Sequence, residues 1–230
     1  MLTLRIPGTY VEALVAGQAL RFFVHNPADV IQRHHLAGEF YEAEELALIA
    51  RYVTPATRYL DIGANVGNHV LYLCRVLGLI QVAVIEPNGQ AIAILKLNLR
   101  LNGLEQVVDT SLLGYGLSDE AGRGDMVCHP DNLGGARFAE GRDGPFEIRT
   151  GDALLAGREF DFVKIDTEGM EMKCLRGIEE LVRRCRPTMF IEVDNENTAA
   201  FLDWCAAHSY VVREKFRRYT VNENYLVMPE

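Results

Sequence analysis

The sequence predicts a doubly wound α/β fold, in which helices cover both faces of a mostly parallel sheet. Strand-like and helix-like segments alternate along most of the chain, and the strand-like segments are apolar without a polar face. The last two of these segments, 210–216 and 225–228, follow each other with no helix between them. We therefore expect that final pair to run antiparallel.

The first half of the chain shows the alternation most clearly. Residues 1–38 mix short β-like runs, at 2–6 and 20–24, with turn residues, and we expect an N-terminal hairpin or cap there. Apolar residues then recur at helical spacing over 39–53, until Pro55 stops the helix. The elements expected next are a strand at 58–62, a helix at 70–78, a strand at 81–85, a helix at 90–101 and a strand at 106–113.

A glycine-rich segment at about 116–151 interrupts this rhythm. We interpret it as an insertion overhanging the site, with a hairpin as one form it can take. Regular order returns with a strand at 160–165, a helix at 170–184, a strand at 188–193 and a helix at 198–208. The expected organisation is a cap over 1–38 and one domain over 39–230.

Composition limits the classes of partner. The 230 residues carry a formal net charge of −9, which argues against broad affinity for nucleic acids or anionic membranes. No apolar stretch approaches the ~20 residues that cross a bilayer, and no secretory signal is recognisable. The five cysteines form no C-x-x-C pair, so we expect neither disulfides nor zinc. A cytoplasmic protein is expected.

The turn after the first strand is the main candidate for a binding loop. Gly63 and Gly67 allow a tight strand-to-helix turn and close approach of a ligand. The pattern G-x-G-x-x-G of dinucleotide sites is absent, because Asn65 and Asn68 replace two of its glycines. The carboxylate of Asp61 would repel a pyrophosphate but favour the amino group and sulfonium of S-adenosylmethionine.

Glu86 ends the second strand, where an acid can accept hydrogen bonds from both ribose hydroxyls of an adenosine. That acid alone would also suit NAD. Structural explanations stay open for the loop: the glycines can serve the tight turn, Asp61 can interact with the helix dipole, and Asn65 can cap the helix.

Several of these runs together resemble the FkbM-type family of S-adenosylmethionine-dependent methyltransferases. The matching runs are DIGANVGNH, IEPN, NLRLNGL, DFVKIDTEGMEMKCLRG and RPTMFIEV, and the resemblance covers roughly residues 39–193. It implies the class I methyltransferase fold, a Rossmann-like seven-stranded sheet with a reversed last strand. It also implies S-adenosylmethionine as cofactor and O-methylation, often of sugar or polyketide hydroxyls.

The same resemblance implies roles for individual residues. Those that would contact the cofactor are Gly63, Asn65, Glu86, Pro87 and Asn88. Leu117 and Ser118, after the third strand, would flank the adenine. Asp166 would reach the methionine end of the cofactor or the acceptor.

The segment 161–169 offers candidates for acting on the acceptor. Strand alternation places Lys164 and Asp166 on one face, and a lysine in an apolar strand needs a partner such as Asp166 or Glu192. That pair can be structural or catalytic. Asp166 is the first candidate for general base or acceptor orienter, Glu168 the second and Glu192 the third. His69 can accept a proton near the glycine loop or simply pack.

Other chemistries lack their motifs. Neither G-x-x-x-x-G-K-[ST], G-x-S-x-G nor H-E-x-x-H occurs. Oxygen ligands of Asp166, Glu168 and Glu192 would suit magnesium, but no metal site is predicted. The expected function is methyl transfer to a hydroxyl oxygen of a small molecule. The alternatives are an NAD-dependent oxidoreductase and a cofactor-binding protein without turnover.

Overall fold

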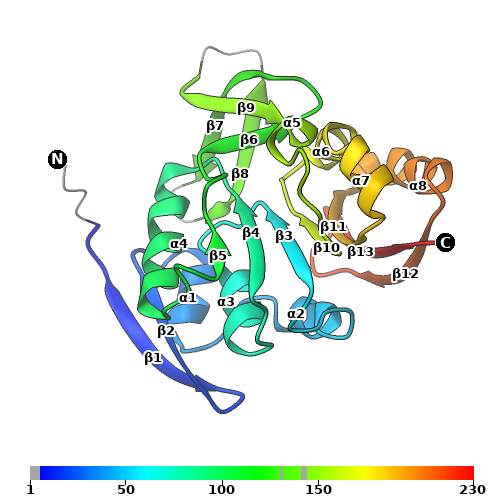
Figure 1. Cartoon of the computed structure of the whole chain (residues 1–230). Coiled ribbons are helices and arrows are strands. Elements are labelled where there is room, and N and C mark those ends of the chain that lie inside the picture. The colour runs from blue at the N-terminus through cyan, green and yellow to red at the C-terminus, as the bar shows by residue number, and fades with distance from the viewer. Residues whose placement is uncertain (1–5, 130–131, 141–143) are drawn as a thin grey trace.

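A seven-stranded sheet forms the centre of the molecule (Figure 1). The computed structural model describes residues 6–129, 132–140 and 144–230. The strand order is β12-β13-β11-β10-β3-β4-β5. The bounds are β3 Arg58–Ile62, β4 Gln81–Ile85, β5 Val108–Asp109, β10 Phe162–Ile165, β11 Thr188–Asp194, β12 Tyr210–Phe216 and β13 Asn222–Pro229.

The direction of each strand follows from its connections. Strands β5, β4, β3, β10 and β11 pair in parallel, each reached through a crossover connection. Strand β13 pairs antiparallel with both β11 and β12. The short 217–221 connection leaves no room for a crossover helix, so β13 has to reverse. The predicted antiparallel pair and the mixed α/β sheet are confirmed.

Helices cover both faces of this sheet (Figure 1). Helices α2 (Ala43–Ile49), α3 (Asn68–Arg75) and α4 (Gly89–Leu101) pack with one apolar cluster of the sheet. Helices α6 (Glu171–Gly177), α7 (Glu179–Cys185) and α8 (Thr198–Ala207) pack with the other. Alternating residues of each strand supply the two clusters: Tyr59 and Phe162 face α2 and α3, whereas Leu60 faces α6.

The N-terminal segment is a hairpin followed by a helix that the sequence did not predict. Strands β1 (Thr9–Val15) and β2 (Gln18–Val24) pair antiparallel, and α1 spans Val30–Leu36. Phe22 of β2 is fully buried and stacks on His35 of α1, with ring centroids 4.5 Å apart. The amide of Phe23 donates to Asn98 Oδ1 of α4 at 2.7 Å. The expected strand at 2–6 falls almost wholly outside the described residues.

The glycine-rich segment forms a second, four-stranded sheet that includes an antiparallel hairpin, one of the forms expected for it. Its strands lie in the order β6-β9-β7-β8, with bounds β6 Tyr115–Ser118, β7 Gly122–His129, β8 Asn132–Glu140 and β9 Phe146–Thr150. A short helix, α5 (Gly151–Leu154), follows. The β7–β8 pair is antiparallel, and β6 lies parallel to β9. Residues 130–131 and 141–143 of the expected insertion lie outside the described residues.

The helix expected over 39–53 spans only Ala43–Ile49, and two further elements differ from the sequence-based expectation. The strand expected over 106–113 contains only Val108–Asp109, because a turn follows before a bridge between Leu113 and Glu86. The helix expected over 170–184 is interrupted at Ile178 and becomes α6 and α7. Gly177 marks the interruption: a Cβ there would lie 2.2 Å from the carbonyl oxygen of Ser118, so α6 and β6 approach backbone to backbone.

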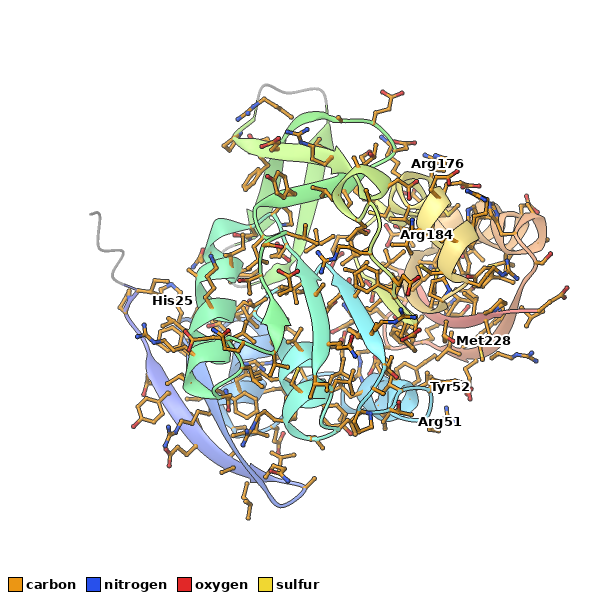
Figure 2. The ribbon with its side chains drawn as sticks, in the orientation of Figure 1. His25, Arg51, Tyr52, Arg176, Arg184 and Met228 are labelled. Atoms are coloured by element: carbon orange, nitrogen blue, oxygen red, sulfur yellow. The ribbon has the colours of Figure 1, made fainter. Side chains whose placement is uncertain are left out.

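The outer end of α2 is attached to the sheet edge. Arg51 and Tyr52 lie beside this edge, with Met228 of β13 nearby (Figure 2). Both side chains bind Glu214 of β12, each at 2.9 Å. In the described part of the chain, no helix is long and apolar enough to span a membrane.

Candidate active site

A cavity of about 340 Å³ opens at the carboxyl ends of β3, β4, β10 and β11. Parallel strands all end at this edge, and the loops that follow them supply most of the wall. Its volume is in the range of small-molecule and cofactor sites. The predicted site residues that line it are Asp61, Gly63, Asn65, His69, Glu86, Pro87, Leu117, Lys164, Asp166 and Glu168.

Gly63 makes the first turn of the cavity wall possible. Its φ is +84°, and a Cβ built on it would lie 1.8 Å from the carbonyl oxygen of Asp166. The loop after β3 and the loop after β10 therefore touch through backbone atoms alone. Gly67, with φ of +87°, caps α3 and packs near Leu95, and it does not line the cavity.

Glu86 is held at the tip of β4 by two backbone amides. Its Oε2 accepts from the amide of Asn65 at 2.9 Å, and its Oε1 accepts from the amide of Asn88 at 2.8 Å. Burial raises the pKa of the Glu86 carboxyl to about 7, against the opposing effect of these two hydrogen bonds. Each oxygen keeps a further lone pair, so Glu86 can still accept hydrogen bonds from a ligand.

Lys164 connects the tips of β3 and β10. Its Nζ donates to Asp166 Oδ2 at 3.0 Å and lies 3.5 Å from Asp61 Oδ1, which confirms the predicted ion pair. Burial opposes the charged form, but the carboxylates of Asp166 and Asp61 raise the pKa of the Lys164 ammonium above its usual range. Neither oxygen of Asp61 accepts a hydrogen bond, although the residue is only 1% exposed and lines the cavity.

Three carboxylates gather where β10 and β11 end. Oxygen atoms of Asp166, Glu168 and Glu192 all lie within 4.8 Å of one another, and all three residues line the cavity. Burial and the charges of Asp166, Glu168 and Glu42 raise the pKa of the Glu192 carboxyl to about 10. The sequence placed these acids at neighbouring strand ends, and the parallel pairing of β10 with β11 brings them together.

His69 faces a carboxylate that sequence reasoning missed. Its Nε2 donates to Glu42 Oε2 at 2.9 Å, and the side chains are 5% and 14% exposed. Burial raises the pKa of Glu42, but the hydrogen bond from His69 and the charges of Lys164 and Arg218 outweigh it and leave that pKa below its ordinary value. Glu42 thus pairs with His69 in the wall of the cavity.

Two further predicted residues lie outside the cavity wall. Asn88 accepts from the amides of Gln90 and Ala91 and so caps α4. Ser118 is 2% exposed, and its hydroxyl donates to Asp119 Oδ1 at 3.0 Å. Pro87 and Leu117, their respective neighbours, do line the cavity.

The N-terminal and C-terminal parts of the chain also supply residues of the cavity wall, and no sequence motif indicated these residues. Val30 and Ile31 come from α1, and Tyr219 and Asn222 come from the loop and strand after β12. Arg218 anchors that loop: its Nη2 donates to Glu44 Oε2 at 2.9 Å, and its Nε donates to Glu45 Oε1 at 2.7 Å. These residues reach the site through tertiary packing, which a one-dimensional pattern does not encode.

A mixed sheet in this order, with a cavity at its strand tips and an acid ending the second strand, defines a Rossmann-like methyltransferase. The model of the methyltransferase FkbM domain matches residues 61–212. The chain belongs to that family and is therefore an S-adenosylmethionine-dependent methyltransferase.

Solved structures show the same fold. A methyltransferase FkbM from Methylobacillus flagellatus is 18% identical with a TM-score of 0.53; the match covers 76% of this chain but only 44% of that one. A ribosomal protein L11 methylase from Lactobacillus delbrueckii subsp. bulgaricus is 12% identical, with a TM-score of 0.51 and coverage of 82% and 79%. A protein of the NADB-Rossmann superfamily from Streptococcus agalactiae is 14% identical, with a TM-score of 0.55 and coverage of 84% and 70%. No curated protein matches the sequence.

The cavity suits S-adenosylmethionine chemically. Asp61 presents two buried oxygens without hydrogen-bond partners, which a cationic ligand can satisfy. The side-chain oxygen of Asn65, also in the wall, is buried without a partner. An anionic pyrophosphate would meet the carboxylates of Asp61 and Asp166 here. The charge of the cavity therefore agrees with the family in favouring S-adenosylmethionine over NAD.

Proposed function

We propose that the protein transfers a methyl group from S-adenosylmethionine to a hydroxyl oxygen of a small molecule, of the sugar or secondary-metabolite class. The observation that carries this proposal is the row of carboxylates at the tips of β10 and β11, beside the loop after β3. Carboxylates can orient a hydroxyl and accept its proton.

The order of the strands supports a direction for the cofactor along the cavity. Neighbouring strands are about 4.8 Å apart, and the tips occur in the order β4, β3, β10, β11. Glu86 would accept the ribose hydroxyls at β4, with Pro87 and Leu117 beside the adenine. Asp61 and Asp166 would face the methionine end near β3 and β10. The acceptor would then occupy the end lined by Glu168 and Glu192.

The proposed reaction needs a proton acceptor next to the hydroxyl. S-adenosylmethionine supplies a methyl group activated by its positive sulfur. A bound acceptor hydroxyl would attack the methyl carbon in line with the carbon–sulfur bond, and the electron pair of that bond would stay on sulfur. The hydroxyl proton passes to a carboxylate, for which Asp166 is the first candidate and Glu168 the second. Lys164 fixes Asp166 through the 3.0 Å hydrogen bond.

Charge and enclosure support a small acceptor. The chain carries a net charge of −9, and carboxylates line the proposed acceptor end, so a nucleic-acid phosphate would be repelled. Tyr41 and Tyr219, which both line the cavity, interact through their hydroxyls. Both features favour a compact, hydroxylated molecule.

Methyl transfer with labelled cofactor tests the proposal. The protein is incubated with methyl-labelled S-adenosylmethionine and a panel of hydroxylated and amino-bearing small molecules, and products are assigned by mass spectrometry and NMR. We expect label in an O-methyl group. Label on nitrogen would contradict the proposal. Micromolar binding of S-adenosylhomocysteine without any transfer would favour a binding protein without turnover.

A further inference from the structure

We infer that the carboxylates at the tips of β10 and β11 form a binding site for a hard divalent cation of the magnesium type. The ligands are carboxylate oxygens of Asp166, Glu168 and Glu192, together with the side-chain oxygen of Asn222. No metal site was predicted from the sequence, although oxygen ligands of Asp166, Glu168 and Glu192 would suit magnesium, and Asn222 was not among the candidate ligands.

The separations of the three carboxylates fit one cation. Magnesium binds oxygen at about 2.0–2.1 Å and calcium at about 2.3–2.6 Å, so opposite ligands lie roughly 4–5 Å apart. The oxygens of Asp166, Glu168 and Glu192 already lie within 4.8 Å of one another. A cation could bind between them without displacement of the strands that carry them.

Asn222 provides an independent indication of a ligand. Its side-chain oxygen is buried without a hydrogen-bond partner, the residue is only 5% exposed, and it lines the same cavity. In the pairing of β11 with β13, Glu192 faces Asn224 and Asp194 faces Asn222. Side chains of facing residues, and of every second residue, share one face of a sheet. Asn222 therefore lies on the face that carries Glu192, where its oxygen can complete the ligand set.

The ligand atoms around the site also favour a hard cation. The Lys164 ammonium lies 3.0 Å from Asp166 Oδ2 and 3.5 Å from Asp61 Oδ1. Glu42 adds another carboxylate to the same cavity wall. Carboxylate and amide oxygens, with no sulfur or imidazole among them, select magnesium, manganese or calcium over zinc or copper.

The role of the cation rests on the proposed function. A hydroxyl oxygen of the acceptor would bind the cation beside Asp166, which would hold that oxygen at the methyl-donor end of the cavity. Coordination lowers the pKa of a bound hydroxyl, so the proton leaves more readily to a neighbouring carboxylate. Acceptors with two adjacent hydroxyls would bind best, because both oxygens could reach one cation.

Manganese binding to the whole protein tests the site directly. Mn²⁺ is titrated in the presence of saturating S-adenosylhomocysteine, and free Mn²⁺ is followed by its paramagnetic resonance. We expect one saturable site per chain with a Kd below about 1 mM, from which Mg²⁺ displaces Mn²⁺. Glu192→Gln and Asn222→Ala should each weaken binding about tenfold or more. The matched control Glu105→Gln, at an exposed acid remote from the strand tips, should bind Mn²⁺ as the unaltered chain does.

The test remains decisive if one of the variants fails to fold. Binding of S-adenosylhomocysteine reports an intact cofactor half, and the titration of the unaltered chain needs no variant. Absence of saturable Mn²⁺ binding to a chain that binds S-adenosylhomocysteine would overturn the proposal, as would unchanged binding in Glu192→Gln.

Activity with a chelator separates this proposal from the proposed function. Loss of O-methyl transfer in EDTA and its recovery with Mg²⁺ would support the role of the cation, whereas full transfer in EDTA would refute that role. Label on nitrogen, with Mn²⁺ still bound, would refute O-methylation and leave the metal site standing.

Discussion

Gly63 shows how one residue determines the geometry of the site. The loops after β3 and β10 touch through backbone atoms there, with space for hydrogen only. We expect Gly63→Ala to lower the free energy of unfolding by about 2–5 kcal/mol, through the clash with Asp166 and the left-handed backbone. Urea denaturation measures the loss. Gly103→Ala is the control, since Gly103 has φ of +66° but open space around it. A loss there of more than about 2 kcal/mol would show that backbone strain alone explains the effect.

Glu86 is the residue on which cofactor affinity should depend most. Glu86→Ala removes the proposed ribose acceptor and should weaken S-adenosylhomocysteine binding by about 1–3 kcal/mol, measured by calorimetric titration. Asn88→Ala is a suitable comparison, because Asn88 lies outside the cavity wall and caps α4. Equal losses in both variants would assign the effect to the loop structure.

The pKa of Glu86 gives cofactor affinity a pH dependence. Its carboxyl has a pKa of about 7, and ribose hydroxyls donate to the ionised form. At pH values below that pKa, ligand binding should therefore release the proton of the Glu86 carboxyl. We expect the affinity for S-adenosylhomocysteine to rise from pH 5.5 to about 7 and then level off, and Glu86→Gln should flatten the rise. Affinity that falls over this range would contradict the ribose contact.

A substitution at Asp166 distinguishes a role in cofactor binding from a role in the methyl-transfer step. Asp166→Asn keeps the shape of the side chain but removes its charge, so turnover should fall by more than the affinity for S-adenosylhomocysteine. Steady-state kinetics and calorimetric titration measure the two quantities on the same preparation. Equal losses in both would assign Asp166 to cofactor binding alone.

At the scale of elements, Asp29 joins the N-terminal helix to the second sheet. Its Oδ1 accepts from the amides of Ile31 and Gln32, and its Oδ2 accepts from the amide of Leu133 at 2.9 Å. Residues of both elements line the cavity, so this one carboxylate fixes two parts of its wall.

Removing Asp29 should therefore loosen both elements. We expect Asp29→Ala to cost about 2–4 kcal/mol in the free energy of unfolding, because it leaves three buried amides without an acceptor. Hydrogen exchange at the amide of Leu133 should become faster. The comparison is Thr150→Ala, which removes a single 3.4 Å cap hydrogen bond from α5 and should cost about 1 kcal/mol or less. Unchanged exchange at Leu133 would show that β8 is held by other contacts.

At the scale of the whole molecule, buried acids make stability depend on pH. The pKa of Glu86 is about 7 and that of Glu192 about 10 in the folded chain, both above the ordinary value of 4.5. Above pH 4.5 the carboxyls of Glu86 and Glu192 lose their protons in the unfolded chain but keep them in the folded chain. The free energy of unfolding should therefore fall as pH rises, first toward 7 and then toward 10.

Denaturant titrations at several pH values test this expectation. Glu86→Gln should flatten the decline between pH 5 and 7, because its side chain does not ionise. Glu105→Gln controls for net charge, since it removes one acid at an exposed position. A decline of equal slope in Glu86→Gln and the unaltered chain would show that Glu86 ionises in the folded state as it does in the unfolded one.

Local sequence patterns determined the central sheet and the part of the site that lies at the strand ends. The alternation of apolar runs predicted β3 and β4 with their observed bounds, because strands buried on both faces are apolar throughout. The ends of parallel strands share one edge, so Asp61, Glu86 and Asp166 could be placed at a single cavity from the sequence. Tertiary structure alone decided the rest. Glu42, Tyr219 and Asn222 reach the cavity by packing between segments far apart in the chain, and that packing depends on shape and burial, which have no periodic signature in one dimension.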